Sequence, residues 1–322
     1  MKHTPAYIFL VSVSFAMSAS AKFVENTDIT SYVNSLIQKN DTVIIPPGNY
    51  RVDATKSIKL KNGTQLQMSP GTKLHVIPNS KDSYRVFLIK NIKNASISGG
   101  VIIGDKYDHL GKTGEWGMGI EIRDSRNINI SNISIDKMWG DAIYVGTNGK
   151  NTTYNINLNN IEMNDNRRQG LTIISADTLS AKNIKATNTS GASPSSGIDI
   201  EPNDGSKTLK NITLDRITTS NNAGPGIQIG LSRYNNSKQP INITIKNHTD
   251  LDSQYGLLVG AINKTPSGTI NLSLLNYTNS KTPSCFNSWT NNKVKIKING
   301  KIGHSKTKTC MGHLKNPSFI FN

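Results

Sequence analysis

Apolar and polar residues alternate along most of the chain, in short runs that open with a small residue. Six such phrases carry apolar side chains at every second position: Gly119–Ile122, Ala142–Val145, Gly170–Ile173, Gly197–Ile200, Gly226–Ile229 and Gly256–Val259. Alternation with a period of two is typical of a β-strand that buries one face. We therefore expect the Ile, Leu and Val side chains to point inward and the residues between them to point outward.

The phrases recur at a regular spacing. Their first inward residues stand at positions 120, 143, 171, 198, 227 and 257. A second alternating run lies between consecutive phrases, as in Asn127–Ile135 and Tyr154–Met163. A period of about 20 to 30 residues is typical of solenoids, and the pattern lacks the helical segments that leucine-rich or ankyrin repeats require. The sequence therefore predicts an all-β fold, a single-stranded parallel β-helix whose stacked coils bury one continuous apolar column.

The N-terminal end differs from the repeats. An apolar run at Tyr7–Ala16 is followed by the small-residue motif Ala19–Ala21, which predicts a signal peptide over residues 1–21, cleaved near Ala21. Residues 22–322 are then expected to form one β-helix domain. Its N-terminal cap extends over about residues 26–50 and includes an amphipathic helix at Asp28–Lys39, which would cover the open end of the apolar column.

The two cysteines, Cys285 and Cys310, stand near the C-terminus. In an exported protein we expect them to form a disulfide that pins the last segment, about residues 281–322, and two free thiols are the alternative. No segment is long and apolar enough for a transmembrane span. The sequence thus predicts a secreted or periplasmic protein, and it leaves the oligomeric state open.

The chain is strongly basic, with 37 Lys and Arg against 21 Asp and Glu and a formal net charge of +16. Such a charge attracts acidic partners at long range, although solubility alone is an alternative explanation. Nucleic acid fits the charge, but the export signal points away from it. We therefore expect an acidic polysaccharide or an anionic cell surface as the partner, and no nucleic acid.

Motifs in the first hundred residues resemble the opening coils of a known superfamily. They are Ile45-Pro-Pro-Gly-Asn-Tyr, Ile58-Lys-Leu-Lys-Asn-Gly-Thr, Ser69-Pro-Gly-Thr and Ile97-Ser-Gly-Gly. They look like the right-handed parallel β-helix superfamily, which includes pectate lyases, polygalacturonases and phage tailspikes. The resemblance implies a right-handed, pectin-lyase-like solenoid over nearly all of the mature chain. It leaves the activity open, because members include hydrolases, lyases, epimerases and non-catalytic proteins.

Outward side chains of neighbouring coils come together when the phrases are aligned on their first inward residue. One position later, the outward column contains Glu121, Tyr144, Thr172, Asp199 and Gln228. A second outward column, two positions before the inward residue, contains Met118, Asp141, Gln169, Ser196 and Pro225. Because neighbouring coils lie about 4.8 Å apart, we expect these residues to form one exposed wall.

The carboxylates on this wall are the predicted catalytic groups. Asp199 and Glu201 alternate with inward isoleucines, so both are expected to face solvent, and Asp141 lies two coils earlier, about 10 Å away. Glycoside hydrolysis needs one carboxylic acid and one carboxylate, and a wide separation between them is typical of inverting enzymes. A plain polar strand face is one alternative, and a calcium site formed with Asp204 is another. No other metal or cofactor is expected.

Other residues of the wall are predicted to bind substrate. Arg167 and Arg168 suit a sugar carboxylate or sulfate, unless they only pair with the neighbouring acids. Trp116, Trp139 and Tyr144 offer flat apolar faces to a sugar ring, unless the two indoles stack internally. Further candidates are Glu121, Gln169, Asp204 and, more weakly, Glu115.

Trp139–Ile143 resembles the two-aspartate coil of the polygalacturonases, with Asp141 at the second acid and Gly140 in place of the first. Met118 and Gln169 stand where that family has an Asp and a His, so ordinary polygalacturonase chemistry is not expected. The calcium-dependent pectate-lyase pattern and the epimerase Asp-Pro-His motif are not found either. The first hypothesis is therefore hydrolysis of an acidic polysaccharide by Asp141, Asp199 and Glu201. A lyase or epimerase acting on uronates, and a non-catalytic glycan-binding surface protein, are the alternatives.

Overall fold

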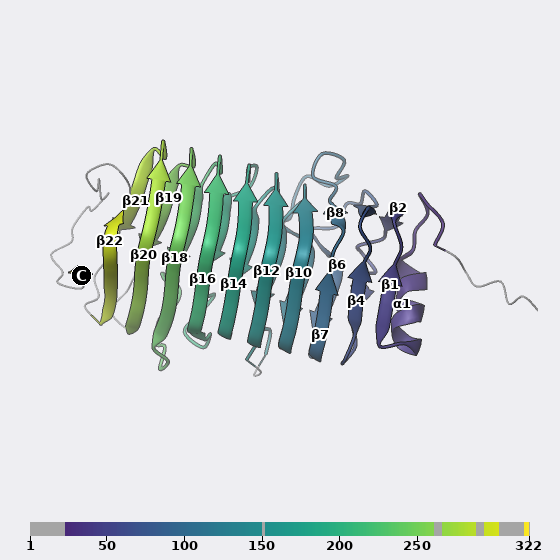
Figure 1. The fold of residues 1–322 in the computed structure, drawn as a ribbon, viewed down its shortest axis with the longest axis horizontal. Coiled ribbons are helices and arrows are strands. Elements are labelled where there is room, and N and C mark those ends of the chain that lie inside the picture. The colour runs from purple at the N-terminus through teal and green to yellow at the C-terminus, as the bar shows by residue number, and fades with distance from the viewer. Residues whose placement is uncertain (1–22, 150–151, 261–265, 288–292, 303–318, 322) are drawn as a thin grey trace, which may run out of the picture.

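The computed structural model describes residues 23–149, 152–260, 266–287, 293–302 and 319–321. The predicted signal peptide and Cys310 lie outside the described residues, so the disulfide stays a prediction. In the described part, one helix and a succession of short strands wind into a long stack of coils (Figure 1). The strands pair in parallel with those one coil away, which confirms the predicted parallel β-helix.

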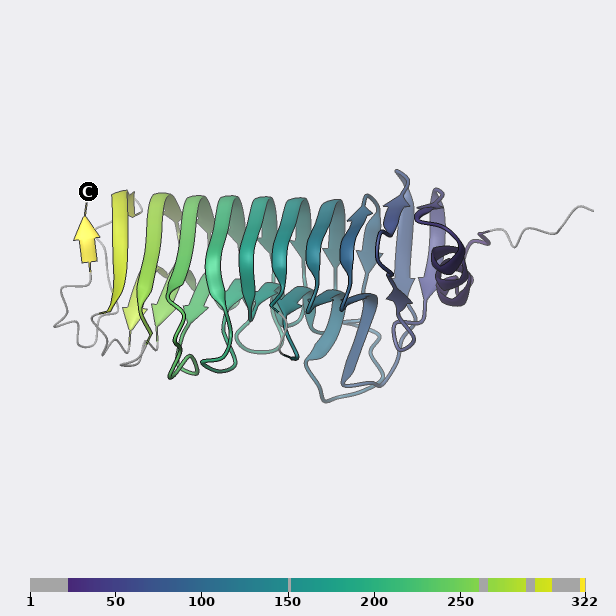
Figure 2. The ribbon, with the colours of Figure 1, turned by 90° about the horizontal axis from the view of Figure 1, so that it is seen from below.

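The strands form two sheets that run the length of the stack (Figure 2). The 14-stranded sheet, sheet A, consists of β1 (Thr42–Ile45), β2 (Gly48–Val52), β4 (Gln65–Met68), β5 (Thr72–Val76), β7 (Lys93–Ser98), β8 (Val101–Ile103), β10 (Arg126–Asp136), β12 (Tyr154–Asn164), β14 (Ala176–Thr187), β16 (Leu209–Ser220), β18 (Ile241–Leu251), β20 (Gly268–Thr278), β22 (Val294–Ile302) and β23 (Phe319–Phe321). The nine-stranded sheet, sheet B, consists of β3 (Ile58–Lys59), β6 (Ser83–Lys90), β9 (Trp116–Arg123), β11 (Asp141–Gly146), β13 (Gln169–Ile173), β15 (Ser196–Ile200), β17 (Pro225–Gly230), β19 (Tyr255–Gly260) and β21 (Thr282–Asn287).

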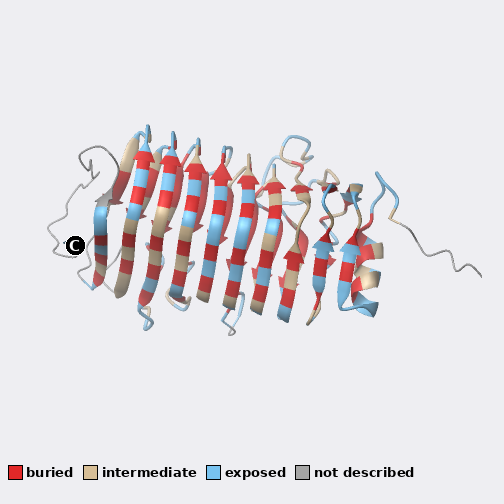
Figure 3. Cartoon of the chain, viewed as in Figure 1, coloured by how far each residue is buried: buried red, intermediate tan, exposed pale blue. Residues whose placement is uncertain are grey.

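Inward side chains of successive coils stack on one another and form the core. In sheet B, one such column is fully buried and contains Ile120, Ile143, Leu171, Ile198, Ile227 and Leu257. Burying a side chain of this type stabilises the fold by about 1.5–3 kcal/mol. The alternation of buried and more exposed positions is visible along the long strands of sheet A in Figure 3. The phrases in the sequence therefore correspond to the strands of sheet B.

The helix α1 (Thr30–Lys39) packs against β1 and β3 at the N-terminal end of the stack (Figure 2). It buries Thr30, Val33 and Ile37, which confirms the predicted capping helix. The helix begins two residues later than predicted because Asp28 forms an isolated bridge with Arg51 and accepts a hydrogen bond from the Thr30 amide at 2.9 Å. Among the described residues, no helix is long and apolar enough to cross a membrane.

Asparagines occupy many turn positions of the coils. Asn127 and Asn155 adopt left-handed φ angles of 55° and 53°, a conformation that Asn tolerates better than most residues. Their side chains form a ladder along the stack: Asn155 donates to Asn127 at 2.9 Å, and Asn127 donates to Asn94 at 2.8 Å. The high asparagine content thus serves the turns as well as the outward strand faces.

Candidate functional site

The outer face of sheet B carries a groove with a volume of about 690 Å³. Its walls come from β6, β9, β11 and β17 and from the segments that precede or follow β9, β13, β15 and β17. The aligned columns predicted from the sequence are confirmed, because Glu121, Tyr144, Thr172, Asp199 and Gln228 stand in register on consecutive strands. Asp141, Gln169 and Ser196 form the second column. Side chains of distant parts of the sequence therefore meet on one wall.

The floor of the groove is a buried polar network. Arg168 donates to both carboxylate oxygens of Asp141, at 3.2 and 3.1 Å, and to the Gln169 side-chain oxygen at 3.0 Å. Thr172 donates to Asp141 at 2.8 Å. Asp141 is fully buried, and burial raises its pKa while the Arg168 guanidinium opposes part of that rise. Asp141 thus anchors Arg168 and is covered from the solvent.

Asp199 was predicted to face solvent, and this is wrong. The side chain points out of the coil but is fully buried, because the outward layer on these coils is itself packed: the Gln169 amide binds its Oδ2 from the preceding coil. Its Oδ1 has no hydrogen-bond partner among the described residues. Burial and the nearby Glu201 carboxyl raise the pKa of Asp199 well above its usual range. The structure therefore favours the neutral acid at this position.

Two other acids reach the groove. Glu201 follows β15, is partly exposed, and has no ion-pair partner among the described residues. Glu115, which precedes β9, has a side chain that is 49% exposed and lies 3.4 Å from the Arg168 Nε. The accessible carboxyls are thus Glu201, as predicted from the sequence, and Glu115, which had been a weaker candidate.

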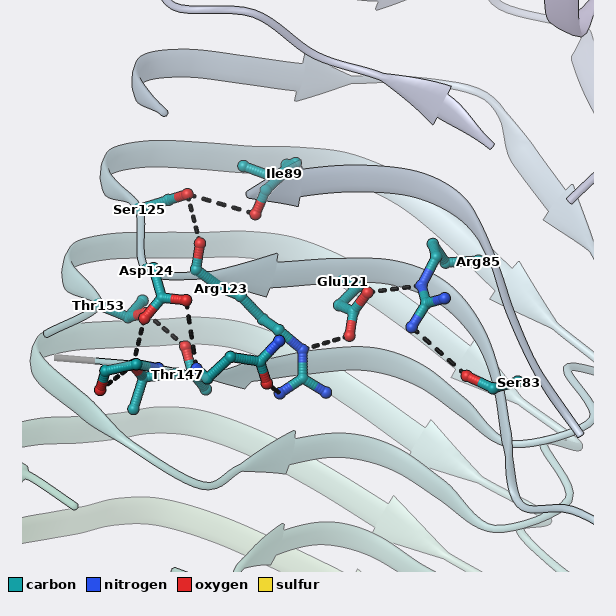
Figure 4. A network of polar contacts seen from close by, with 12 residues as sticks. Ser83, Arg85, Ile89, Glu121, Arg123, Asp124, Ser125, Thr147 and Thr153 are labelled. Atoms are coloured by element: carbon teal, nitrogen blue, oxygen red, sulfur yellow. Dashed lines mark hydrogen bonds and ion pairs between the residues drawn. The ribbon is translucent and has the colours of Figure 1, made fainter. Parts of the chain in front are cut away.

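Arginines line the groove on both sides of these acids. Arg85 and Arg123 form ion pairs with the two oxygens of the buried Glu121, the former at 2.5 Å (Figure 4). Arg123 also donates to the Asn148 side chain at 2.6 Å and lies 4.1 Å from the centre of the Tyr144 ring. Glu121, predicted to contact substrate, is instead a buried counter-ion that holds two arginines in place, because its outward column is covered by their long side chains.

The predicted pair of groove-facing tryptophans is only half correct. Trp116 lines the groove and is 49% exposed. Trp139 is stacked between the His109 ring, at 4.1 Å, and the Arg167 guanidinium, at 3.8 Å. Arg167 also donates to the carbonyl oxygens of Gly114, at 2.9 Å, and Trp139. Both Trp139 and Arg167 therefore fix the segment before β9 and are absent from the groove lining, because that segment folds back over them.

Asp204 does not reach the groove. Its carboxylate binds the Ser206 amide at 2.7 Å and the Lys207 ammonium at 3.3 Å, which closes a surface turn after β15. Among the described residues, no three His, Cys, Asp or Glu side chains are grouped so as to hold a metal ion. In this structure the three carboxylates considered for a calcium site, Asp199, Glu201 and Asp204, are therefore not grouped together. Cys285 is buried in β21.

The sequence pattern missed several residues of the groove. Arg85 stands in register with Met118, so extending the outward column by one coil toward the N-terminus would have found it. Arg123 is the outward residue that follows Glu121 on the same strand. Asn203 and Arg233 lie on segments after β15 and β17 that have no period, and no sequence signal marks them.

Comparison with known proteins gives no match to a family model. A curated relative, the uncharacterized protein YclG of Bacillus subtilis, is 28% identical over 223 residues, which is 61% of this chain but only 38% of that protein's length. The polygalacturonase of Erwinia carotovora is similar in structure with a TM-score of 0.62 at 13% identity, over 93% of this chain and 91% of that one.

A tailspike protein of the Acinetobacter baumannii bacteriophage Fri1, described as a capsular polysaccharide depolymerase, is similar with a TM-score of 0.57 at 15% identity. The match covers 92% of this chain and 61% of the tailspike. These similarities extend over nearly the whole solenoid while the sequences have diverged widely. In fold, this chain is therefore a right-handed parallel β-helix of the pectin-lyase-like type.

Proposed function

We propose that the groove on sheet B binds an acidic polysaccharide and hydrolyses its glycosidic bonds, outside the cytoplasm. One observation carries the proposal: Arg85, Arg123, Arg168 and Arg233 line the same groove as two accessible carboxyls, Glu115 and Glu201. Arginines match sugar carboxylates or sulfates, and paired carboxyls are the groups that hydrolysis needs. The shared fold of a polygalacturonase and of a polysaccharide depolymerase supports the same substrate class.

Binding depends on arginines that are held in place before the substrate arrives. Glu121 fixes Arg85 and Arg123, and Asp141 fixes Arg168. A side chain that is already ordered loses less entropy when it binds a ligand. Trp116 offers an exposed ring for a sugar face beside these cations. The net charge of +16 draws an anionic polymer toward the protein.

Glu201 is assigned as the general acid. It donates its proton to the glycosidic oxygen while the bond between that oxygen and the anomeric carbon breaks. Asp199 lies next to Glu201 in the fold: because burial favours the neutral form of Asp199, this group does not repel the carboxylate that Glu201 becomes. Asp199 thus affects the reaction without touching the substrate.

Glu115 is assigned as the general base. It forms an ion pair with Arg168 at 3.4 Å, and a carboxylate in this place can accept a proton from a water molecule. The oxygen of a water molecule bonds to the anomeric carbon, and the proton that this water loses passes to Glu115. The buried Asp141, one of the three catalytic groups predicted from the sequence, supports Glu115 through their shared partner Arg168.

The assay is incubation of the purified protein with a panel of acidic polysaccharides, followed by product analysis. New reducing ends without ultraviolet-absorbing unsaturated uronates support hydrolysis, whereas unsaturated products establish a lyase and binding without products establishes a glycan-binding protein. Glu201→Gln and Glu115→Gln are each expected to lower the rate at least about a hundredfold. Asp204→Asn removes a carboxylate outside the groove and is the matched control. Full activity of Glu201→Gln would exclude the proposed acid.

A further inference from the structure

A second concave surface lies at the turn that follows β9, outside the groove. It has a volume of about 480 Å³. Lys93 at the start of β7, Arg126 at the start of β10 and Tyr154 at the start of β12 line it. We call this surface the turn cleft. None of these residues lines the groove or takes part in the proposed hydrolysis.

The three side chains form a row across neighbouring coils. Arg126 is in register with Lys93 on one side and with Tyr154 on the other. Neighbouring parallel strands lie about 4.8 Å apart, so two basic residues stand at facing positions of adjacent strands. Like charges that face each other across strands destabilise a sheet. Repulsion between Lys93 and Arg126 is therefore expected to destabilise the sheet locally, and a bound anion would reduce this repulsion.

Nearby carboxylates do not neutralise this pair. Within the part of the chain that the structure describes, neither Lys93 nor Arg126 has an ion-pair partner. Asp124 also lines the turn cleft, but its carboxylate accepts hydrogen bonds from the Thr147 hydroxyl and, at 3.2 Å, from the Asn148 amide (Figure 4). The turn cleft is thus lined by two cations without an ion-pair partner among the described residues and by one carboxylate that is hydrogen-bonded to Thr147 and Asn148.

The third member of the row indicates the kind of anion. Tyr154 is 46% exposed, so its ring is accessible to a ligand beside the two cations. A flat ring beside two cations matches a sugar that carries carboxylates or sulfates, because the ring face packs on the ring and the anionic group meets the cations. A small inorganic anion would use the cations alone, and a neutral sugar would use the tyrosine alone.

The turn cleft and the groove lie on the two sides of the short turn between β9 and β10. Arg123 lines the groove, and Arg126, three residues later in the chain, lines the turn cleft. We propose that the turn cleft is a second binding site for an acidic polysaccharide, distinct from the groove. The inference rests on the proposed function only for the class of ligand. A polymer held at both places is bound more tightly than at either one, because the second contact is intramolecular.

The experiment measures binding separately at the two sites. The parent protein is the mature chain with Glu201→Gln, so that no probe is consumed, and the probes are trigalacturonate and a sulfated trisaccharide, measured by titration calorimetry at low salt. The double change Arg126→Ala/Tyr154→Ala removes two of the three side chains of the row in the turn cleft, and Arg85→Ala/Arg168→Ala removes two of the four groove arginines. Arg216→Ala removes an exposed arginine elsewhere on sheet A and is the matched control. Melting temperatures verify that each variant is folded.

The parent and the control are expected to bind two trisaccharides per chain. The turn-cleft variant should bind one, with the lost site weakened at least about tenfold, and the groove variant should also bind one. If the turn-cleft variant still binds two, the inference is overturned while the proposed function stands. If only the turn-cleft variant loses binding, the inference stands and the groove is not the substrate site. Failure of the parent to bind either probe overturns both.

Discussion

A buried histidine is expected to make the stability of the fold depend on pH. His248 of β18 is completely buried inside the solenoid, in register with Ile217 and Leu275. Its Nε2 lies 2.8 Å from the Thr219 hydroxyl and its Nδ1 lies 3.0 Å from the Tyr277 hydroxyl. Thr219 donates its own proton to Asp250 at 2.6 Å, so Nε2 donates to Thr219, and in the neutral imidazole Nδ1 accepts from the Tyr277 hydroxyl. This network fits the neutral imidazole.

The size of this effect on the free energy of unfolding follows from the pKa of His248. Burial lowers the pKa of His248 from 6.5 to about 3. Below pH 6.5 His248 binds a proton in the unfolded chain, whereas in the folded protein it stays neutral down to about pH 3. The free energy of unfolding therefore falls as the pH falls from 6.5 to 3. The gap of about 3.5 pH units, at about 1.4 kcal/mol per unit, amounts to about 5 kcal/mol at pH 3. Above pH 7 the effect vanishes.

The variant to test is His248→Gln, because the glutamine side chain keeps one hydrogen-bond donor and one acceptor but does not titrate. Urea unfolding of both proteins is measured at half-unit steps from pH 4 to pH 7. We expect the free-energy difference between wild type and variant to shift in favour of the variant by about 1.4 kcal/mol for each pH unit below 6. Other buried acids such as Asp250, whose pKa burial raises, act in the opposite direction but are present in both proteins.

A control variant separates this effect from the other histidines. His75 is partly buried, and burial followed by Lys73 lowers its pKa; His75→Gln is therefore expected to remove a smaller part of the pH dependence. A difference between wild type and His248→Gln that stays constant from pH 4 to pH 7 would refute the assignment of a neutral, buried imidazole.

Three further outcomes can be measured. Glu121→Gln removes the shared counter-ion of two arginines, so we expect unfolding free energy to fall by about 2 kcal/mol in urea titrations and acidic oligosaccharide to bind more weakly; unchanged binding would mean that these arginines do not contact substrate. Trp116→Ala should raise KM about tenfold with an unchanged melting temperature, because the ring is half exposed. Asn127→Ala, which loses the left-handed turn preference and the bond to Asn94, should cost about 1–2 kcal/mol by urea unfolding, whereas Asn127→Gly should cost less.

Much of this architecture follows from the period of the sequence. A β-strand alternates its side chains strictly, so fixing one inward residue such as Ile198 fixes the facing of Asp199 and of its neighbours in register. The spacing of the phrases then places Asp141, Gln169 and Asp199 on one wall before any coordinates are known. The fold and the alignment of the columns were therefore predictable, because both depend on the backbone repeat alone.

The accessibility of these side chains was not predictable in the same way. Outward facing does not mean exposed when long neighbours cover a short one, and Asp199 is buried while Glu201, two residues later, reaches the groove. Some of the covering contacts come from strand residues, such as Gln169 on Asp199, and others come from segments without a period, such as the stretch before β9 that brings His109 onto Trp139. The depth of the groove and the choice of its acids are therefore set in part by these insertions. Changes of function in such a solenoid should therefore arise in the insertions more readily than in the strands.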